Sequence, residues 1–239
     1  MMLEVNDIST YYGDARALFG VSLKIEQGEV ITLLGRNGMG KTTTIHSIMG
    51  ITPARSGEIR FRGKDTRSLP SYRISQLGIG LVPEGRQIFP NLTVRENLLA
   101  TARASSSTSS KSVDQQWTYE RVVQLFPILA ERAGFMGNLL SGGEQQMLAV
   151  GRALLTNPDL LLLDDATEGL APLIRGQIWE SLAALKREGI SMLVVDKNVK
   201  DLFPLADRHY VVESGHVVWS GGSRELQNDA ELQNRYLGV

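Results

Sequence analysis

The octapeptide Gly35–Thr42, GRNGMGKT, is the feature that most constrains how this chain can fold. It fits the pattern G-x-x-x-x-G-K-[ST] at every fixed position, between the apolar run Val30–Leu34 and a segment of helical periodicity. In such a loop, N–H groups turn inward around phosphate oxygens, while Lys41 supplies positive charge and Thr42 offers a hydroxyl to Mg²⁺. The motif predicts a site for a nucleoside triphosphate and Mg²⁺.

A second element completes this prediction. Leu160–Leu163 is a run of four leucines that leads directly into Asp164 and Asp165. Such a run is typical of a buried parallel strand, which delivers the next side chains to the carboxyl edge of a sheet. We expect Asp164 to join the Mg²⁺ shell. Together the two elements predict a P-loop nucleotide hydrolase or kinase.

The remaining sequence alternates strand and helix patterns, which predicts an α/β fold with a mostly parallel sheet. Strands are expected at 3–8, 20–25, 30–34, 78–83, 160–163 and 190–196, and hairpins at 57–65 and 209–221. We expect residues 1–87 and 157–239 to form the nucleotide-binding core and 88–156 to form an inserted helical subdomain. Within the insertion, the serine-rich stretch 104–112 predicts a mobile surface connection.

Composition excludes several other classes of protein. The 239 residues include 25 Lys and Arg against 26 Asp and Glu, so there is no broad electrostatic case for nucleic-acid binding. The absence of cysteine rules out a disulfide scaffold, an iron–sulfur site and a thiol nucleophile. Neither a secretory signal nor an apolar run of the ~18–20 residues needed for a membrane span is expected. The three histidines lack the spacing of metal ligands, so no zinc site is expected.

The segment Leu140–Glu144, LSGGE, opens a helix and admits two interpretations. Ser141 and Glu144 have the spacing of a capping box, which many helices use. A cap does not explain Gly142 and Gly143, each of which costs a helix ~1 kcal/mol. Adjacent glycines favour the close approach of an anion to the positive end of the helix.

With this segment, the sequence resembles the ATP-binding cassette (ABC) family over essentially its whole length, because LSGGE closely matches the family signature LSGGQ. The resemblance implies a RecA-like P-loop core with an N-terminal antiparallel β subdomain and an inserted helical subdomain. It also implies Walker A at Gly35–Thr42, Walker B at Leu160–Asp165, the Q-loop at Pro83–Pro90, the D-loop at Glu168–Pro172 and the switch at Val195–Asn198.

The segments VPEGRQIFPNLTVRENL, TEGLAP and RYLGV further resemble the ATPase subunits of branched-chain amino acid importers of the LivF type. This implies ATP and Mg²⁺ as cofactors and head-to-tail pairing with a second, different cassette. It further implies two membrane permease subunits, a solute-binding protein acting indirectly, and a peripheral place on the cytoplasmic face of the bacterial inner membrane. A soluble cassette of DNA repair or translation is disfavoured, since those carry tandem cassettes or long coiled-coil insertions.

The resemblance assigns roles to individual positions, with Ser141, Gly142 and Gly143 completing a site on the partner chain. The implied nucleotide-binding residues are Tyr12, which would stack on adenine, Gly35, Arg36, Asn37, Gly38, Met39, Gly40, Lys41, Thr42, Thr43, Ser141, Gly142, Gly143 and Glu144. The implied metal-binding residues are Thr42, Asp164 and Glu84.

The most consequential departure from the family is Asp165, which stands where the catalytic glutamate is expected. Aspartate is one methylene shorter, so the attacking water would lie ~1 Å from its ideal place, and such a shift can cost ~100-fold in rate. We therefore expect slow or absent hydrolysis with ATP binding retained. The alternative to an active transport ATPase is a hydrolysis-impaired regulatory cassette whose partner supplies turnover.

Two further departures carry opposite charge. Glu84 stands at the Q-loop glutamine and Lys197 at the switch histidine. One hypothesis is that the two compensate each other near the γ-phosphate, which would make Asp165, Glu84 and Lys197 the catalytic candidates. The alternative is that both are surface residues beside a substituted site. Ala171 also replaces the usual D-loop aspartate.

Overall fold

The computed structural model describes residues 1–103 and 116–237, so the serine-rich stretch 104–112 lies outside the described residues. The strands are β1 Leu3–Tyr12, β2 Ala15–Ile25, β3 Val30–Leu34, β4 Ser56–Phe61, β5 Lys64–Asp65, β6 Ile79–Val82, β7 Leu160–Leu163, β8 Ser191–Val195, β9 Arg208–Glu213 and β10 His216–Gly221. The helices are α1 Lys41–Ile48, α2 Ser71–Gln76, α3 Val94–Leu99, α4 Tyr119–Leu125, α5 Pro127–Glu131, α6 Gly142–Leu154, α7 Pro172–Arg187, α8 Val199–Leu202, α9 Ser223–Asn228 and α10 Ala230–Leu232, with short helical turns η2 Gly137–Leu139 and η3 Gln233–Leu237.

The central sheet has the strand order β10-β9-β3-β8-β7-β6. All of its pairings are parallel except that of β9 with β10. Strands β3, β7 and β8 are buried along their whole length, which explains their predominantly apolar sequences. The carboxyl ends of β3, β6, β7 and β8 therefore meet at one edge, where the phosphate loop and the acidic residues follow.

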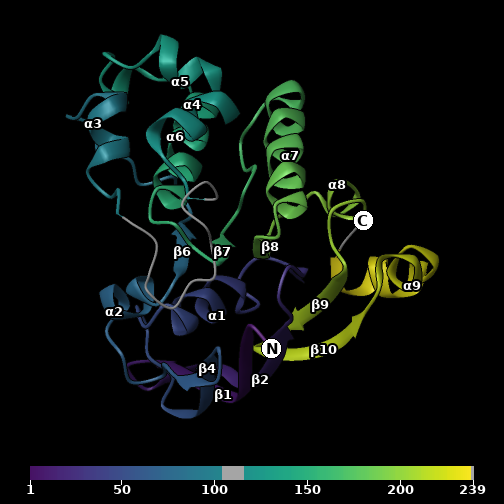
Figure 1. Cartoon of the computed structure of the whole chain (residues 1–239). Helices are drawn as coiled ribbons and strands as arrows, with labels where there is room; N and C mark the ends of the chain where they lie inside the picture. Colours follow the sequence, from purple (N-terminus) through teal and green to yellow (C-terminus); the bar gives the residue numbers. More distant parts are fainter. Residues whose placement is uncertain (104–115, 238–239) are drawn as a thin grey trace.

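Each face of the central sheet contributes to a different hydrophobic core. Along β7, Leu161 and Leu163 pack into the core that includes α6 and α7, whereas Leu160 and Leu162 pack into the core around α1. This alternation is the two-residue period of a strand. The smaller sheet, of order β2-β1-β4-β5, closes the second core. Figure 1 shows α1 between the two sheets.

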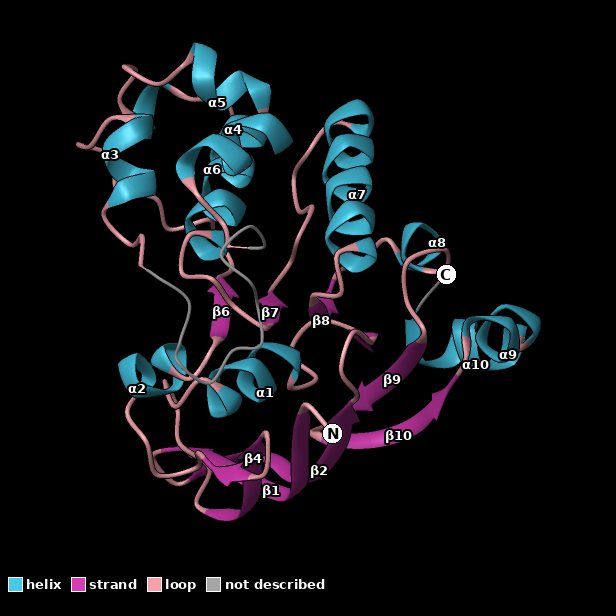
Figure 2. Cartoon of the chain, in the orientation of Figure 1, coloured by secondary structure: helices cyan, strands magenta, loops and turns pink. Residues whose placement is uncertain are grey.

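The helices α3, α4, α5 and α6 form a group beyond the carboxyl edge of β6 and β7 (Figure 2). The fold class expected from the sequence, a P-loop α/β core with an N-terminal antiparallel part and inserted helices, is confirmed. The division at residues 88 and 156 stays a prediction. Strands β1 and β2 extend further than predicted, because their pairing continues through several register shifts to Tyr12 and Ala15 at the turn. Across the described residues, none of the helices combines the length and hydrophobicity that a bilayer crossing requires.

His209 on β9 provides a test of the buried core. Its ring is fully buried, with Nδ1 2.7 Å from Thr32 Oγ1 and Nε2 2.9 Å from Ser223 Oγ. Burial lowers the pKa of His209 from 6.5 to about 4. As the pH falls, the imidazole of His209 is protonated in the unfolded chain, at about pH 6.5, before it is protonated in the folded chain. Above pH 6.5 it is neutral in both states, so its contribution to the free energy of unfolding is constant there. It then falls as the pH drops towards 4, by about 3 kcal/mol in total.

We expect the difference in unfolding free energy between wild type and His209→Gln to shrink by about 3 kcal/mol between pH 7 and pH 4. Urea denaturation at several pH values measures this difference, and the variant serves as the reference for every other titrating group. A difference that is independent of pH would show that His209 does not remain neutral in the folded state.

Candidate functional site

The phosphate loop joins β3 to α1 and needs glycine at both ends. Gly35 has φ 140°, and a Cβ there would overlap the carbonyl oxygen of Val212. Gly40 has φ 108°, and a Cβ there would come within 2.8 Å of Leu18 Cδ2. Gly40 also caps α1 without a side-chain hydrogen bond. The loop therefore presents the positive end of α1, with its backbone N–H donors, to an anion.

Lys41 bridges the loop from inside. Its Nζ donates to the carbonyl oxygens of Gly35 at 2.7 Å and Arg36 at 2.9 Å. Burial lowers the pKa of Lys41, although the carboxylates of Asp165 and Asp164 oppose this shift. The ammonium is thus held at the centre of the loop, where phosphate oxygens can replace the carbonyl groups as its partners.

Asp164 lies directly beside the loop and is 1% exposed. Its Oδ1 accepts a hydrogen bond of 3.2 Å from Thr42 Oγ1, whereas its Oδ2 is buried without a hydrogen-bond partner. Burial raises the pKa of Asp164 to about 6, against the effect of the Thr42 hydroxyl. A buried carboxylate oxygen with a free lone pair, next to a hydroxyl, fits the oxygen ligands that Mg²⁺ prefers. Thr42 and Asp164 would hold the ion, which supplies charge neutralisation at the phosphates.

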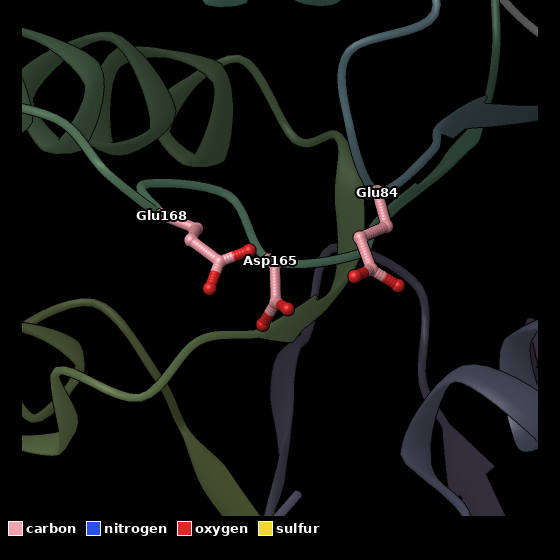
Figure 3. A group of neighbouring side chains, drawn as sticks. All are labelled: Glu84, Asp165 and Glu168. Carbon is pink, nitrogen blue, oxygen red and sulfur yellow. The ribbon is translucent and has the colours of Figure 1, made fainter.

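A cavity of about 260 Å³ opens in front of these groups. Its lining residues are Asn37, Gly38, Gly40, Lys41, Thr42, Thr43, Glu84, Asp165 and Glu168. The carboxylates of Glu84, Asp165 and Glu168 form its acidic end. Figure 3 shows these three side chains, and one oxygen from each lies within 4.8 Å of the others. Burial, followed by the negative charges of Glu168 and Glu84, raises the pKa of Asp165. The acidic end can bind a cation or orient a water molecule beside a phosphate.

The sheet brings these carboxylates together. Strands β6 and β7 pair in parallel with Val82 opposite Leu163, and Asp164 N–H donates to Val82 O at 3.0 Å. Glu84 and Asp165 therefore follow neighbouring strands at the same edge. Glu84 belongs to the cavity as the sequence predicts, and its role as a metal ligand stays a prediction.

Lys197 lies elsewhere. It is not among the residues that line this cavity, and its Nζ forms an ion pair of 3.5 Å with Glu168 Oε1. Charge compensation between Glu84 and Lys197 near the γ-phosphate stays a prediction, and the observed ionic partner of Lys197 is Glu168. The reason is the course of the loop after β7, which places Glu168 between Lys197 and the cavity.

Sequence reasoning missed the role of Asp196, a buried residue at the end of β8. Its Oδ2 accepts hydrogen bonds from the N–H and hydroxyl of Thr167, at 2.7 and 2.6 Å. Its Oδ1 accepts from the backbone and side-chain N–H groups of Asn198, both at 2.8 Å. Asp196 therefore ties the loop after β7 to the switch segment. An acidic residue directly after a buried apolar strand was the available signal, as it was for Asp164.

The LSGGE segment lies outside the cavity of its own chain. Ser141 is exposed and forms the predicted capping box with Glu144. The Glu144 carboxylate also pairs with Arg132 Nε at 3.3 Å. A Cβ on Gly143 would come within 2.5 Å of Ile174 Cγ2, so packing against α7 already requires glycine there. Contact of Ser141, Gly142, Gly143 and Glu144 with a partner's nucleotide stays a prediction.

Three other predicted binding residues flank the phosphate loop. Tyr12 is 50% exposed, and its hydroxyl lies 3.5 Å from Thr43 Oγ1. Arg36 donates to Asn234 O at 3.5 Å. The Met39 carbonyl oxygen accepts from Gly215 N–H at 3.0 Å, which anchors the turn between β9 and β10. Tyr12 therefore offers an aromatic face beside the start of α1, while Met39 secures the loop to the sheet.

A glycine-bounded phosphate loop, a central lysine and a buried aspartate at the edge of a parallel sheet define a P-loop nucleoside triphosphatase. Comparison with known proteins narrows this class, because a family model described as ABC transporter matches residues 18–168. The chain belongs to the ABC transporter family, and it is an ATPase of the ATP-binding cassette type.

Two relatives and two solved structures illustrate this membership. The high-affinity branched-chain amino acid transport ATP-binding protein BraG of Pseudomonas aeruginosa is 43% identical, over 99% of this chain and 100% of that protein. The lipopolysaccharide export system ATP-binding protein LptB of Escherichia coli K12 is 32% identical, over 99% and 97%. A nucleotide-free ATP-binding cassette from an ABC transporter superposes with a TM-score of 0.82, at 28% identity and 96% coverage of both chains. The ADP conformation of the cassette MJ1267 superposes with 0.81, at 27% identity, over 100% and 99%.

Proposed function

We propose that this chain is the ATP-hydrolysing subunit of an importer of branched-chain or related amino acids. The observation that carries the proposal is the phosphate site, in which Lys41 and Thr42 line one cavity and Asp164 is hydrogen-bonded to Thr42, in a chain similar to BraG over its whole length. In this proposal the chain acts at the cytoplasmic face of the bacterial inner membrane. It pairs head-to-tail with a second cassette and drives two permease subunits. A solute-binding protein delivers the amino acid to these permeases.

Different residues of this chain bind the phosphates, the adenine and Mg²⁺ in this proposal. The N-terminus of α1 and Lys41 bind the phosphates, and Tyr12 stacks on the adenine. Thr42 and Asp164 hold Mg²⁺, which neutralises phosphate charge when bound. The carboxylates at the acidic end of the cavity orient the attacking water. Ser141, Gly142 and Gly143 complete the partner's site in the same proposal.

Reconstitution tests the proposal. Liposomes that contain this chain, its partner cassette and the two permeases should accumulate radiolabelled leucine only with external solute-binding protein and internal Mg-ATP. Accumulation that is equally fast without ATP would contradict the proposal. Genes for these partners lying beside that of this chain would add independent support.

A second candidate, the hydrolysis-impaired regulatory cassette, is favoured by Asp165 and by Ala171 in place of the usual D-loop aspartate. It predicts that the isolated chain binds ATP without turnover and that the paired complex hydrolyses only at the partner's site. In that case Asp165→Glu should raise turnover by about 100-fold.

A further inference from the structure

Glu168 lines the same cavity as Asp165, and its side chain is one methylene group longer than that of Asp165. It lies on the loop after β7, its side chain lines the cavity, and its carboxylate lies within 4.8 Å of that of Asp165 (Figure 3). The half-buried Asp165 adopts φ 52° at the start of this loop. The longer side chain of Glu168 therefore lies next to Asp165, whose side chain is one methylene shorter than the glutamate expected at that position.

The backbone around Glu168 is fixed from several directions. Thr167 is held by the buried Asp196 through two hydrogen bonds. The carbonyl oxygen of Glu168 accepts from Arg86 Nη2 at 3.2 Å, and its N–H donates to Asp165 O at 3.4 Å. Although its side chain is 49% exposed, Glu168 starts from a defined place at the rim of the cavity. Such positioning is what a water-orienting group requires.

Lys197 distinguishes Glu168 from the other two carboxylates. Its ammonium lies 3.5 Å from Glu168 Oε1, on a switch segment that Asp196 ties to the same loop. The positive charge offsets the repulsion that Asp165 and Glu84 exert on an ionised Glu168. Lys197 thus acts as a positioning residue.

An independent observation points to a ligand next to this cavity, at Asp164, whose Oδ1 accepts a hydrogen bond from the cavity-lining Thr42. The Oδ2 atom of Asp164 is buried without a hydrogen-bond partner, and it belongs to a side chain that is 1% exposed. The three carboxylates therefore share a cavity with Thr42, which together with Asp164 would hold Mg²⁺, and they are more than an acidic patch on the surface.

We infer that Glu168 is the carboxylate that binds and deprotonates the attacking water in this chain, in the role that the glutamate after the Walker B aspartate has elsewhere in the family. The inference rests on the proposed function and assigns its catalytic base. The water oxygen forms a bond to the γ-phosphorus, and the bond from that phosphorus to the bridging oxygen breaks. ADP leaves with the bridging oxygen, and the water proton passes to Glu168 and then to solvent.

The test uses the full chain, alone and in the assembled transporter, with phosphate release and ATP-analogue affinity measured on the same samples. Glu168→Gln should lower turnover by about 100-fold and change affinity by less than about threefold. Glu180→Gln, on the exposed face of α7, is the matched control and should leave both quantities unchanged. Adding Asp165→Glu to Glu168→Gln should restore turnover to within about tenfold of wild type, because it returns the missing methylene.

Three results would overturn the inference: wild-type turnover in Glu168→Gln, an equal loss of affinity and turnover, or no recovery on adding Asp165→Glu. A wild-type chain that binds ATP but hydrolyses none in either setting would overturn it as well, and would favour the regulatory cassette. A wild-type chain that fails to bind ATP would instead contradict the proposed function.

Discussion

Replacing Lys41 with alanine is expected to weaken ATP binding by about 100-fold and to lower turnover by about 1000-fold. The ammonium lies between the carbonyl oxygens of Gly35 and Arg36, so its charge is in place before a nucleotide arrives. Charge-assisted hydrogen bonds contribute about 1.5–3 kcal/mol each, and about 3 kcal/mol corresponds to 100-fold in affinity. The larger effect on turnover follows because negative charge shifts towards the leaving group as the phosphoryl group transfers.

Titration with a fluorescent ATP analogue and a phosphate-release assay measure the two quantities. Lys64→Ala removes an exposed lysine on β5 and is the matched control. Equal effects of the two variants would show that only the net charge of the chain matters. Circular dichroism of Lys41→Ala separates a lost contact from a lost fold.

Asp164→Asn is expected to stabilise the nucleotide-free chain while it lowers Mg²⁺-dependent turnover by about 1000-fold. Burial in the folded chain raises the pKa of Asp164 from 3.8 to about 6, so the ionised carboxylate lowers the free energy of unfolding at pH 7. That cost is present above pH 6, is relieved as the pH falls towards 3.8, and amounts to about 2–3 kcal/mol. A neutral amide avoids this cost, but it is a weaker ligand for a hard cation.

Urea denaturation at pH 7.5 without nucleotide should therefore show an unfolding free energy about 2 kcal/mol higher for Asp164→Asn than for wild type. Asp201→Asn, exposed on α8, is the control, because an amide oxygen can still accept the hydrogen bond from Trp179. A variant that is less stable than wild type yet hydrolyses Mg-ATP normally would refute this account of Asp164.

Asp164 and His209 change the free energy of unfolding in opposite directions over the same pH range. Falling pH relieves the cost of the buried Asp164 carboxylate, whereas it penalises the buried neutral imidazole of His209. The two contributions nearly cancel between pH 6.5 and 4. The stability of wild type thus reveals little about either group, and the single variants are needed to separate them.

The sequence predicted the local parts of the site well, since Gly35–Thr42 and Leu160–Leu163 each carry their own strand and turn signals. It could not predict the ion pair of Lys197 with Glu168, which depends on the course of two loops at the edge of the sheet. Pattern alone also favoured an anion as the reason for Gly143. The close contact with Ile174 arises from the docking of α7 onto α6, which no local signal reports.

The central position of β3 has a consequence for how this protein is made. Its two neighbours in the sheet are β8 and β9, which begin at Ser191 and Arg208, more than 150 residues after β3. At about 5–20 residues per second, a ribosome releases the strand that carries the phosphate loop many seconds before either neighbour exists. During that interval the growing polypeptide exposes an unpaired apolar strand. The nucleotide site can therefore form only after β8 and β9 have been synthesised.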